Sequence, residues 1–385
     1  MPIAPSEMAA VLEGYPAAPV LGVVGSHSAL DIADGAVTEG FHSLVLAQKG
    51  RETTYARYYR TLRNPDGTRR RGCVDEVWTY EKFVDLAKPA EQAKLRDHGV
   101  LLVPNRAFSS YVPLDSIERD FRVPLVGSRN LLRLEERTER DNYYALLEWA
   151  GIPAPPAVPS PQEIHELSMV KLPHATRRLE RGFFTVASAF EYERKSAQLV
   201  EQGSITRQDL RSARIERYIV GPVFNFNFFF SPLVPRDEGL ELLGVDERRE
   251  SSLDGLVRLP AAQQLELTDT DRTPAYTVVG HGTLTVRESL LEEVFRLGER
   301  FVEACRERYP PGILGPFCLQ TCIDRDGRPW VFDVATRIGG GTNIHLGLGH
   351  PYGNALHRTP MSSGRRIAVE VRRALADHRL KEIVT

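Results

Sequence analysis

The 385-residue sequence is poor in cysteine and lysine and has no long uninterrupted hydrophobic run. Its four cysteines, Cys73, Cys305, Cys318 and Cys322, include no C-x-x-C pair, which argues against a thiolate metal site and a secreted disulfide scaffold. The most apolar stretch, residues 218–235, is broken by prolines and asparagines that a bilayer would penalise, so it predicts a core strand. The first residues have neither the basic nor the apolar region of a signal peptide. We therefore expect a cytoplasmic protein without membrane attachment.

An excess of positive charge is also missing. The 49 basic and 51 acidic residues give a formal net charge of −2, so the chain lacks the basic field on which nonspecific nucleic-acid binding depends. Its composition, with 42% hydrophobic and 26% charged residues, is typical of a globular protein with two or three domains. We expect small-molecule substrates, no nucleic-acid partner and a homo-oligomer.

The pattern of apolar and helical segments changes once along the chain. Apolar runs at 20–24, 43–46 and 100–103, with a helical pattern after the first, predict a parallel sheet built from β-α-β units. A proline-dense segment at 151–161 then marks a joint, and the pattern beyond it predicts an α+β arrangement. Strands are expected there at 168–172, 183–187, 215–219, 223–230, 317–323 and 330–336, and helices at 131–149, 288–308 and 366–377.

The most informative element is the hairpin near the end of the chain. Asp326-Gly327 is typical of a two-residue turn, and such a turn places Gln320 opposite Asp333. Their side chains would lie about 5 Å apart on one face of the sheet, with Arg337 further along it. Paired side-chain oxygens suit a hard cation such as Mg²⁺. A solvent-exposed polar pair is the alternative.

Two further segments suggest phosphate binding. The glycine-rich run 339–343 follows the hairpin and could bring backbone N–H groups close to phosphate oxygens. Lys171 lies in a strand-like run, although only seven of the 49 basic residues are lysines, and its ammonium could neutralise phosphate charge. A lysine on an edge strand, where it blocks unwanted sheet pairing, is the alternative.

Two weaker signals complete the candidate site. The run 216–221 ends a strand-like segment on a glycine, and its free backbone groups could pair with an adenine edge. His27 follows the first apolar run, where open α/β sheets bind ligands. The alternative is a histidine that caps the next helix.

Taken together, these residues resemble the ATP-grasp superfamily and, within it, the archaeal-type 5-formaminoimidazole-4-carboxamide ribonucleotide synthetases, which are formate-dependent ligases of purine biosynthesis. The likeness spans nearly the whole chain. It is carried by the runs Gly25–Ser28, Gln48–Arg51, Val123–Arg133, Leu253–Pro260, Arg287–Leu291, Pro311–Gln320 and Gly340–Asn343.

The resemblance implies an ATP-grasp fold of mixed α/β and α+β class. An N-terminal parallel-sheet domain is expected at 1–125 and the ATP-grasp domain at 126–385, with an ATP subdomain near 150–230 and a metal-binding hairpin near 315–345. The implied activity is that of an ATP-dependent carboxylate–amine ligase that works through an acyl phosphate. Its implied substrates are formate and aminoimidazole carboxamide ribotide, with ATP and Mg²⁺ or Mn²⁺ as cofactors.

The resemblance also assigns roles to individual residues. Arg337 and His27 are expected to act in catalysis, and Gln320 and Asp333 to bind the metal. The ribotide is expected to contact His27, Ser28, His281 and Asn343, and the nucleotide to contact Lys171, Glu216, Arg217, Tyr218, Ile219 and Glu250.

The chain departs from the family pattern around the acceptor. Asn105-Arg106-Ala107 stands where the family has His-Gly-Ser, and His281 stands where it has an asparagine. The lost hydroxyl leaves Arg106 as the residue expected to hold the ribotide, through its phosphate. The loop 174–182 lacks the family's glycines, and Ala335 stands where a polar metal contact is common. There are two alternatives. The chain could be a paralogous amide ligase with another nucleotide-like or specialised substrate, or an inactive nucleotide-binding protein.

Overall fold

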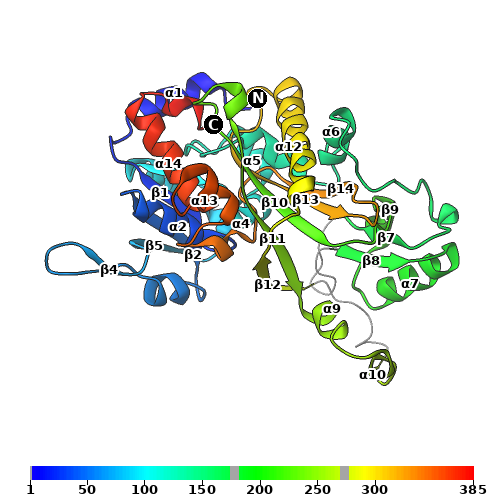
Figure 1. Cartoon of the computed structure of the whole chain (residues 1–385). Helices are drawn as coiled ribbons and strands as arrows, with labels where there is room; N and C mark the ends of the chain where they lie inside the picture. The colour runs from blue at the N-terminus through cyan, green and yellow to red at the C-terminus, as the bar shows by residue number, and fades with distance from the viewer. Residues whose placement is uncertain (1, 174–181, 269–276) are drawn as a thin grey trace.

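The computed structural model describes residues 2–173, 182–268 and 277–385, which form three main sheets and a two-stranded ribbon. The parallel sheet with its helices lies at one side of the molecule, the small sheet of β7, β8 and β9 at the other, and the five-stranded sheet between them (Figure 1). The predicted mixture of α/β and α+β architecture is confirmed. None of the helices in these described ranges combines the length and apolar character needed to cross a bilayer.

The N-terminal sheet is parallel, as the β-α-β pattern predicted, and its strand order is β5-β2-β1-β6. Helices cover both faces of the sheet, so strands β1 and β6 are buried along their whole length. This explains why their sequences are continuous apolar runs without polar alternation. The strands are β1 (Val20–Val24), β2 (His42–Gln48), β5 (Glu76–Tyr80) and β6 (Val100–Val103). One face packs against α2 (Ala29–Thr38) and α14 (Ser363–Ala376), the other against α3 (Pro89–Asp97), α4 (Arg106–Tyr111) and α5 (Leu114–Arg119).

The end of the chain returns to this N-terminal sheet. Helix α14 crosses α2 so closely that a Cβ on Gly35 would lie 2.3 Å from the carbonyl carbon of Gly364, so the crossing requires glycine. Leu125 and Thr385 exchange two backbone hydrogen bonds of 3.0 Å. The first core therefore contains side chains from both ends of the sequence, and the domain boundary near 125 stays a prediction.

The central sheet is antiparallel, in the order β12-β11-β10-β13-β14. One face packs against α6 (Tyr143–Trp149) and α12 (Glu288–Arg308). Phe317 stacks there on Phe228 and Phe301, with ring centroids 5.2 and 5.3 Å apart. The strands are β10 (Val223–Phe230), β11 (Leu240–Glu250), β12 (Val278–Thr283), β13 (Gly315–Ile323) and β14 (Pro329–Ala335).

The third sheet has the order β8-β7-β9 and is covered by α7 (Ala189–Glu201) and α8 (Arg207–Arg211). Its strands are β7 (Ser168–Lys171), β8 (Phe183–Val186) and β9 (Arg214–Arg217). The other elements are α1 (Pro5–Glu13), η1 (Thr54–Tyr58), β3 (Leu62–Arg63), β4 (Arg69–Arg71), η2 (Phe83–Ala87), η3 (Arg129–Glu135), η4 (Pro161–Glu163), η6 (Arg236–Glu238), α9 (Ser251–Leu256), α10 (Ala261–Leu265), η7 (Thr342–His345), α13 (Pro351–His357) and η8 (Leu380–Glu382).

Two expectations about these elements were wrong. The predicted helix at 131–149 is divided into the turn η3 and helix α6, because the Asn142 side chain accepts a hydrogen bond from the Tyr144 N–H and starts a new helix. Strands β11 and β12 were not predicted, nor were β3, β4 and β5 in the N-terminal half. The charged residues at the end of β11 and the glycines of β12 hide the alternation that marks a strand.

The hairpin of β13 and β14 has the predicted pairing but not the predicted turn. Asp324 and Arg328 close a three-residue turn with Gly327 at φ +78°, one residue longer than expected. Between Gln320 and Thr321 the pairing shifts by one, which leaves Phe332 as an extra residue in β14. The bulge offsets the longer turn, so Gln320 does lie opposite Asp333.

Candidate active site

A cavity of about 900 Å³ lies between the carboxyl end of the parallel sheet and the polar face of the central sheet. It brings together residues from both halves of the chain, which matches the rule that open α/β sheets bind ligands beyond the carboxyl ends of their strands. Six of the predicted site residues line it: His27, Arg106, His281, Gln320, Asp333 and Arg337.

A row of polar residues crosses the central sheet at the cavity wall. Asp246 of β11 pairs with Asn225 of β10, Asn225 pairs with Gln320 of β13, and Gln320 pairs with Asp333 of β14. Paired residues on neighbouring strands point to the same face, so all four side chains line the cavity. Only Gln320 and Asp333 were expected from the sequence, because Asn225 lies inside a phenylalanine-rich run and Asp246 lies on the unpredicted strand β11.

The buried end of this row is held by amide groups. Asn225 and Asn227 donate hydrogen bonds of 2.8 and 2.7 Å to the Asp246 carboxylate. Burial nevertheless raises the pKa of Asp246 to about 6. The Oδ1 atom of Asn225 is buried and has no hydrogen-bond partner among the described residues, so it can accept a hydrogen bond from a ligand.

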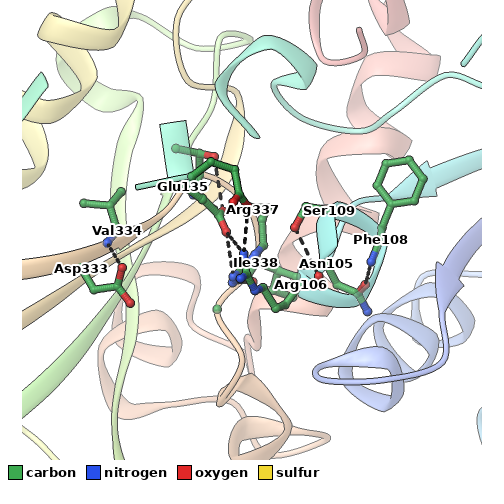
Figure 2. Close-up of polar contacts among 12 residues, drawn as sticks. Asn105, Arg106, Phe108, Ser109, Glu135, Asp333, Val334, Arg337 and Ile338 are labelled. Carbon is green, nitrogen blue, oxygen red and sulfur yellow. Dashed lines mark hydrogen bonds and ion pairs between the residues drawn. The ribbon is translucent and has the colours of Figure 1, made fainter. Parts of the chain in front are cut away.

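The other end of the row offers oxygens for a metal ion. The Gln320 amide oxygen accepts a hydrogen bond from the Arg248 guanidinium. One Asp333 oxygen accepts a 3.2 Å bond from the Val334 N–H, as Figure 2 shows. An amide oxygen and a carboxylate on a cavity wall fit a hard cation such as Mg²⁺. Arg248, which sequence analysis did not identify, also lines the cavity and adds positive charge beside this pair.

Glu135 holds two cavity arginines together, as Figure 2 shows. Its carboxylate lies 3.1 Å from Arg337 and 3.3 Å from Arg106, and it accepts a 3.0 Å hydrogen bond from the Thr336 N–H. The Nε atom of Arg337 is buried without a hydrogen-bond partner in the described part of the chain. Arg337 is therefore oriented by Glu135 and keeps one donor for an anionic ligand.

The glycine-rich loop and the segment after β1 form the opposite wall. Gly340 lies against His27, since a Cβ at Gly340 would lie 3.9 Å from the His27 ring. Ser28 and Asn343 are not among the lining residues: the Ser28 hydroxyl donates to the Gly339 carbonyl, and the Asn343 oxygen accepts a 3.0 Å bond from the Asp31 N–H. In the structure they fix the loop to the start of α2, and their contact with a ribotide stays a prediction.

The departures from the family pattern have different consequences. Ala107 is buried in the core beneath the parallel sheet, so it does not mark a lost cavity contact as the sequence suggested. Helix α4 instead presents Ser109 and Ser110 to the cavity. His281 does line the cavity, and burial together with the nearby Arg248 lowers its pKa to about 4. Its imidazole is therefore neutral at pH 7.

Lys171 lies on the central strand of the small sheet, which rules out the edge-strand alternative. Its side chain is buried, forms an ion pair with Glu216 and donates bonds of 2.8 and 2.9 Å to the Tyr144 hydroxyl and the Phe332 carbonyl. Burial lowers the pKa of Lys171 to about 8, although the Glu216 charge opposes this shift. Lys171 is not among the lining residues of the cavity, and the loop 174–181 that follows it lies outside the described residues.

The predicted adenine-binding segment connects the small sheet to the central sheet. The Arg217 and Tyr218 N–H groups donate 2.9 Å bonds to the Pro156 and Leu167 carbonyls, and the Ile219 carbonyl accepts a weak bond from the Cys322 thiol. Burial, the Cys322 thiol and the Glu250 charge raise the pKa of Tyr218. Glu250, at the end of β11, is thus near this segment, although neither lines the cavity.

Comparison with known proteins places these features in a class. Two solved structures share the fold. A structure of N5-carboxyaminoimidazole ribonucleotide synthetase matches with a TM-score of 0.56 and 11% identity, over 90% of this chain and 79% of that one. The structure of biotin carboxylase from Campylobacter jejuni matches with a TM-score of 0.57 and 9% identity, over 91% of this chain and 70% of that one. The arrangement of a parallel sheet, a small sheet and a central antiparallel sheet with the cavity between them is the ATP-grasp fold.

Closer relatives define the family. The 5-formaminoimidazole-4-carboxamide-1-(beta)-D-ribofuranosyl 5'-monophosphate synthetase of Methanothermobacter thermautotrophicus is 40% identical to this chain, over 98% of each sequence. The enzyme of the same name from Methanocaldococcus jannaschii is 37% identical, over 95% of this chain and 94% of its own sequence. The crystal structure of an IMP biosynthesis protein PurP from Thermococcus kodakaraensis matches with a TM-score of 0.69 and 30% identity, over 95% of this chain and all of that one. Family models described as "Protein of unknown function (DUF1246)" and "Domain of unknown function (DUF1297)" match residues 21–158 and 191–385. The chain belongs to the 5-formaminoimidazole-4-carboxamide ribonucleotide synthetase family.

Proposed function

We propose that this chain is an ATP-dependent ligase that joins formate to the 5-amino group of aminoimidazole carboxamide ribotide. A formate oxygen attacks the γ-phosphorus of ATP and ADP leaves, which gives formyl phosphate. The ribotide amine then attacks the formyl carbon, loses a proton and expels phosphate to form the amide. The observation that supports this proposal most is the cavity that combines the proposed metal pair, five arginines and the histidine after β1, in a chain 40% identical to a named synthetase.

The arginines of the cavity fit the charge of this reaction. Arg337, held by Glu135 and with a free Nε donor, and Arg248, beside Gln320, face the wall where phosphoryl transfer would occur. Arg106 is half-exposed at the cavity rim, where it can bind the ribotide phosphate. Arginine suits this task, because its planar guanidinium presents N–H donors in a fork that matches the oxygens of a phosphate group.

Gln320 and Asp333 are the residues that would hold Mg²⁺ or Mn²⁺. When bound, the ion neutralises phosphate charge that builds up during phosphoryl transfer. Lys171, Glu216, Arg217, Tyr218, Ile219 and Glu250 are proposed to bind the nucleotide, and His27, Ser28, His281 and Asn343 the ribotide.

A second candidate keeps this chemistry and changes the acceptor. The specific observation in its favour is His281, a neutral imidazole on the cavity wall that can donate one hydrogen bond and accept another. A paralogous substrate would be a nucleotide-like amine that pairs with this ring.

The test is to incubate the purified chain with ATP, Mg²⁺, the ribotide and ¹⁸O-labelled formate. The proposal expects a formylated ribotide that depends on ATP, ADP in equal amount, and one ¹⁸O atom in the released phosphate. ADP release with another amine, in the absence of ribotide turnover, would favour the paralogue. No ADP release with any amine would support a nucleotide-binding protein without turnover.

A further inference from the structure

A second cluster of side chains lies at the opposite end of the parallel sheet from the cavity. His42 begins β2, Glu76 begins β5, and His98 caps the C-terminal end of α3. The cavity lies beyond the carboxyl ends of these strands, whereas this cluster lies at their amino ends, and its three residues are absent from the lining of the cavity. It takes no part in the proposed ligase reaction.

The topology explains why the three side chains meet. Leu44 pairs with Glu76 across the parallel strands, so His42, two residues earlier, projects from the same face as Glu76. Helix α3 packs on that face through Leu95, which brings its last turn over the start of β5. His98 then reaches the Glu76 carboxylate from above, and its ring packs against Trp78 with centroids 5.1 Å apart.

The ligand atoms converge on one carboxylate oxygen. The Nε2 atoms of His42 and His98 lie 3.2 and 2.8 Å from Oε2 of Glu76, and all three atoms lie within 4.8 Å of one another. Donors around a tetrahedral Zn²⁺ at normal bond lengths are ~3.4 Å apart. Small side-chain movements would therefore place a metal ion among them.

Two further contacts orient these groups, as outer partners do in metal sites. The Trp78 indole donates a 2.6 Å hydrogen bond to Oε1 of Glu76, which leaves Oε2 for the histidines. The Asp75 carboxylate lies 3.9 Å from Nδ1 of His42 and is itself held by the Ser43 N–H at 3.1 Å. This distance is too long for a hydrogen bond, so Asp75 places negative charge behind the His42 ring without fixing its tautomer.

We propose that His42, Glu76 and His98 form a Zn²⁺ site with one coordination position open to water. Imidazole nitrogens suit Zn²⁺ and not Mg²⁺ or Ca²⁺, and a carboxylate is a common third ligand of Zn²⁺. The side chains are 33–45% exposed, so the ion and a water molecule can enter without unfolding. Bound Zn²⁺ would fasten the end of α3 to the starts of β2 and β5.

The experiment uses the full chain stripped of metal with a chelator. Co²⁺ is the spectroscopic probe, its visible absorption reports histidine ligation, and Zn²⁺ competition gives the affinity. Loss of a residue that only orients a metal ligand weakens metal binding by about 10–100-fold. We expect His42→Gln and His98→Gln, which each remove a ligand, to weaken Zn²⁺ binding by at least this amount. Trp78→Phe should weaken it within that range. His165→Gln, at an exposed histidine elsewhere, is the matched control and should bind like the native chain.

The same titrations are repeated on Asp333→Asn, which removes the carboxylate of the proposed Gln320–Asp333 metal pair in the cavity. The Co²⁺ absorption and the Zn²⁺ affinity should be unchanged in this variant. Zn²⁺ should also raise the melting temperature of the native chain but not of His98→Gln, whose metal-free melting temperature checks that it folds. Equal Zn²⁺ affinity in the native chain, His42→Gln and His98→Gln would reject the site and leave a hydrogen-bonded surface cluster. A signal abolished by Asp333→Asn would also reject it.

Discussion

One carboxylate oxygen of Glu135, Oε2, lies 3.1 Å from Arg337 and 3.3 Å from Arg106, and the Glu135 side chain is only 4% exposed. The glutamate comes from the turn η3 before the ATP-grasp sheets, whereas Arg337 follows β14 and Arg106 begins α4. One buried anion thus sets the distance between a cation proposed to act in phosphoryl transfer and a cation proposed to bind the ribotide phosphate. We regard Glu135 as a positioning residue, because its own contacts are with protein groups.

Glu135→Gln should lower kcat/KM by about tenfold or more, because a hydrogen bond between charged groups contributes about 1.5–3 kcal/mol and the amide cannot hold both guanidinium groups. The measurement is steady-state turnover with ATP and ribotide varied separately. A positioning role predicts a fall in kcat and a rise in the KM of the ribotide. Glu136→Gln is the control, since within the described residues the Glu136 carboxylate forms a single ion pair, with Arg106 at 4.0 Å. Equal effects of the two substitutions would contradict the role of Glu135.

Asp333→Asn should reduce turnover sharply at limiting Mg²⁺ and leave the fold intact, because it removes the only formal negative charge of the proposed metal pair. Turnover is measured over a Mg²⁺ series, with circular dichroism and melting temperature as checks on folding. Asp326→Asn changes an exposed aspartate in the turn of the same hairpin and should have no effect. Full activity of Asp333→Asn at limiting Mg²⁺ would remove this residue from the metal site.

Local sequence patterns predicted the pairing of Gln320 with Asp333 for partly wrong reasons. A two-residue turn places Gln320 opposite Asp333, and the true turn has three residues, yet the bulge at Phe332 restores the pairing. A bulge depends on what packs around it, and the Phe332 carbonyl is used by Lys171 from another sheet. Such compensation cannot be read from the hairpin sequence.

Other parts of the site could not be predicted because their partners are distant in the chain. Glu135 is one of several glutamates in a charged segment, and only the fold shows that it meets Arg337, about 200 positions later. Asp246 and Arg248 lie on a strand whose charged residues hide its alternation. The parallel strands β1, β2 and β6 and the helix at 288–308, by contrast, follow from regular apolar patterns and are confirmed.

Lys171→Met should weaken ATP binding and remove its pH dependence. The pKa of Lys171 is about 8, so its positive charge is present at pH 7 and lost as the pH rises through 8. Calorimetry on the native chain should show ATP affinity falling by up to about tenfold between pH 7 and 9, whereas Lys171→Met should be weaker and flat over this range.

Unfolding does not explain this fall. Folding lowers the pKa of Lys171, so its contribution to the free energy of unfolding rises between pH 8 and 10.5. Lys195→Met, at a partly exposed lysine paired with Glu191, should keep the native profile. Native affinity in Lys171→Met at both pH values would exclude Lys171 from nucleotide binding.

His281 and Ala107 both differ from the family pattern, but only His281 lines the cavity, so we expect their substitutions to have different effects. His281→Asn restores the family residue on the cavity wall and exchanges one neutral hydrogen-bonding group for another, because the His281 pKa of about 4 keeps the ring neutral. One such bond contributes roughly 0.5–1.5 kcal/mol, so kcat/KM for the ribotide should change by no more than about tenfold. Ala107→Ser should bring no gain, since residue 107 faces the core and not the cavity. Its buried hydroxyl should instead cost roughly 1–3 kcal/mol of unfolding free energy.

Three proteins are compared for this test: the native chain, His281→Asn and Ala107→Ser, each assayed for ribotide turnover and for urea unfolding. Efficient native turnover, little changed in His281→Asn, supports the aminoimidazole ribotide as substrate. A large gain in His281→Asn over a slow native protein would instead show that the imidazole belongs to a different acceptor, and the paralogue would replace the proposed function. A gain from Ala107→Ser without loss of stability would show that α4 turns this residue toward the ligand, contrary to its buried position.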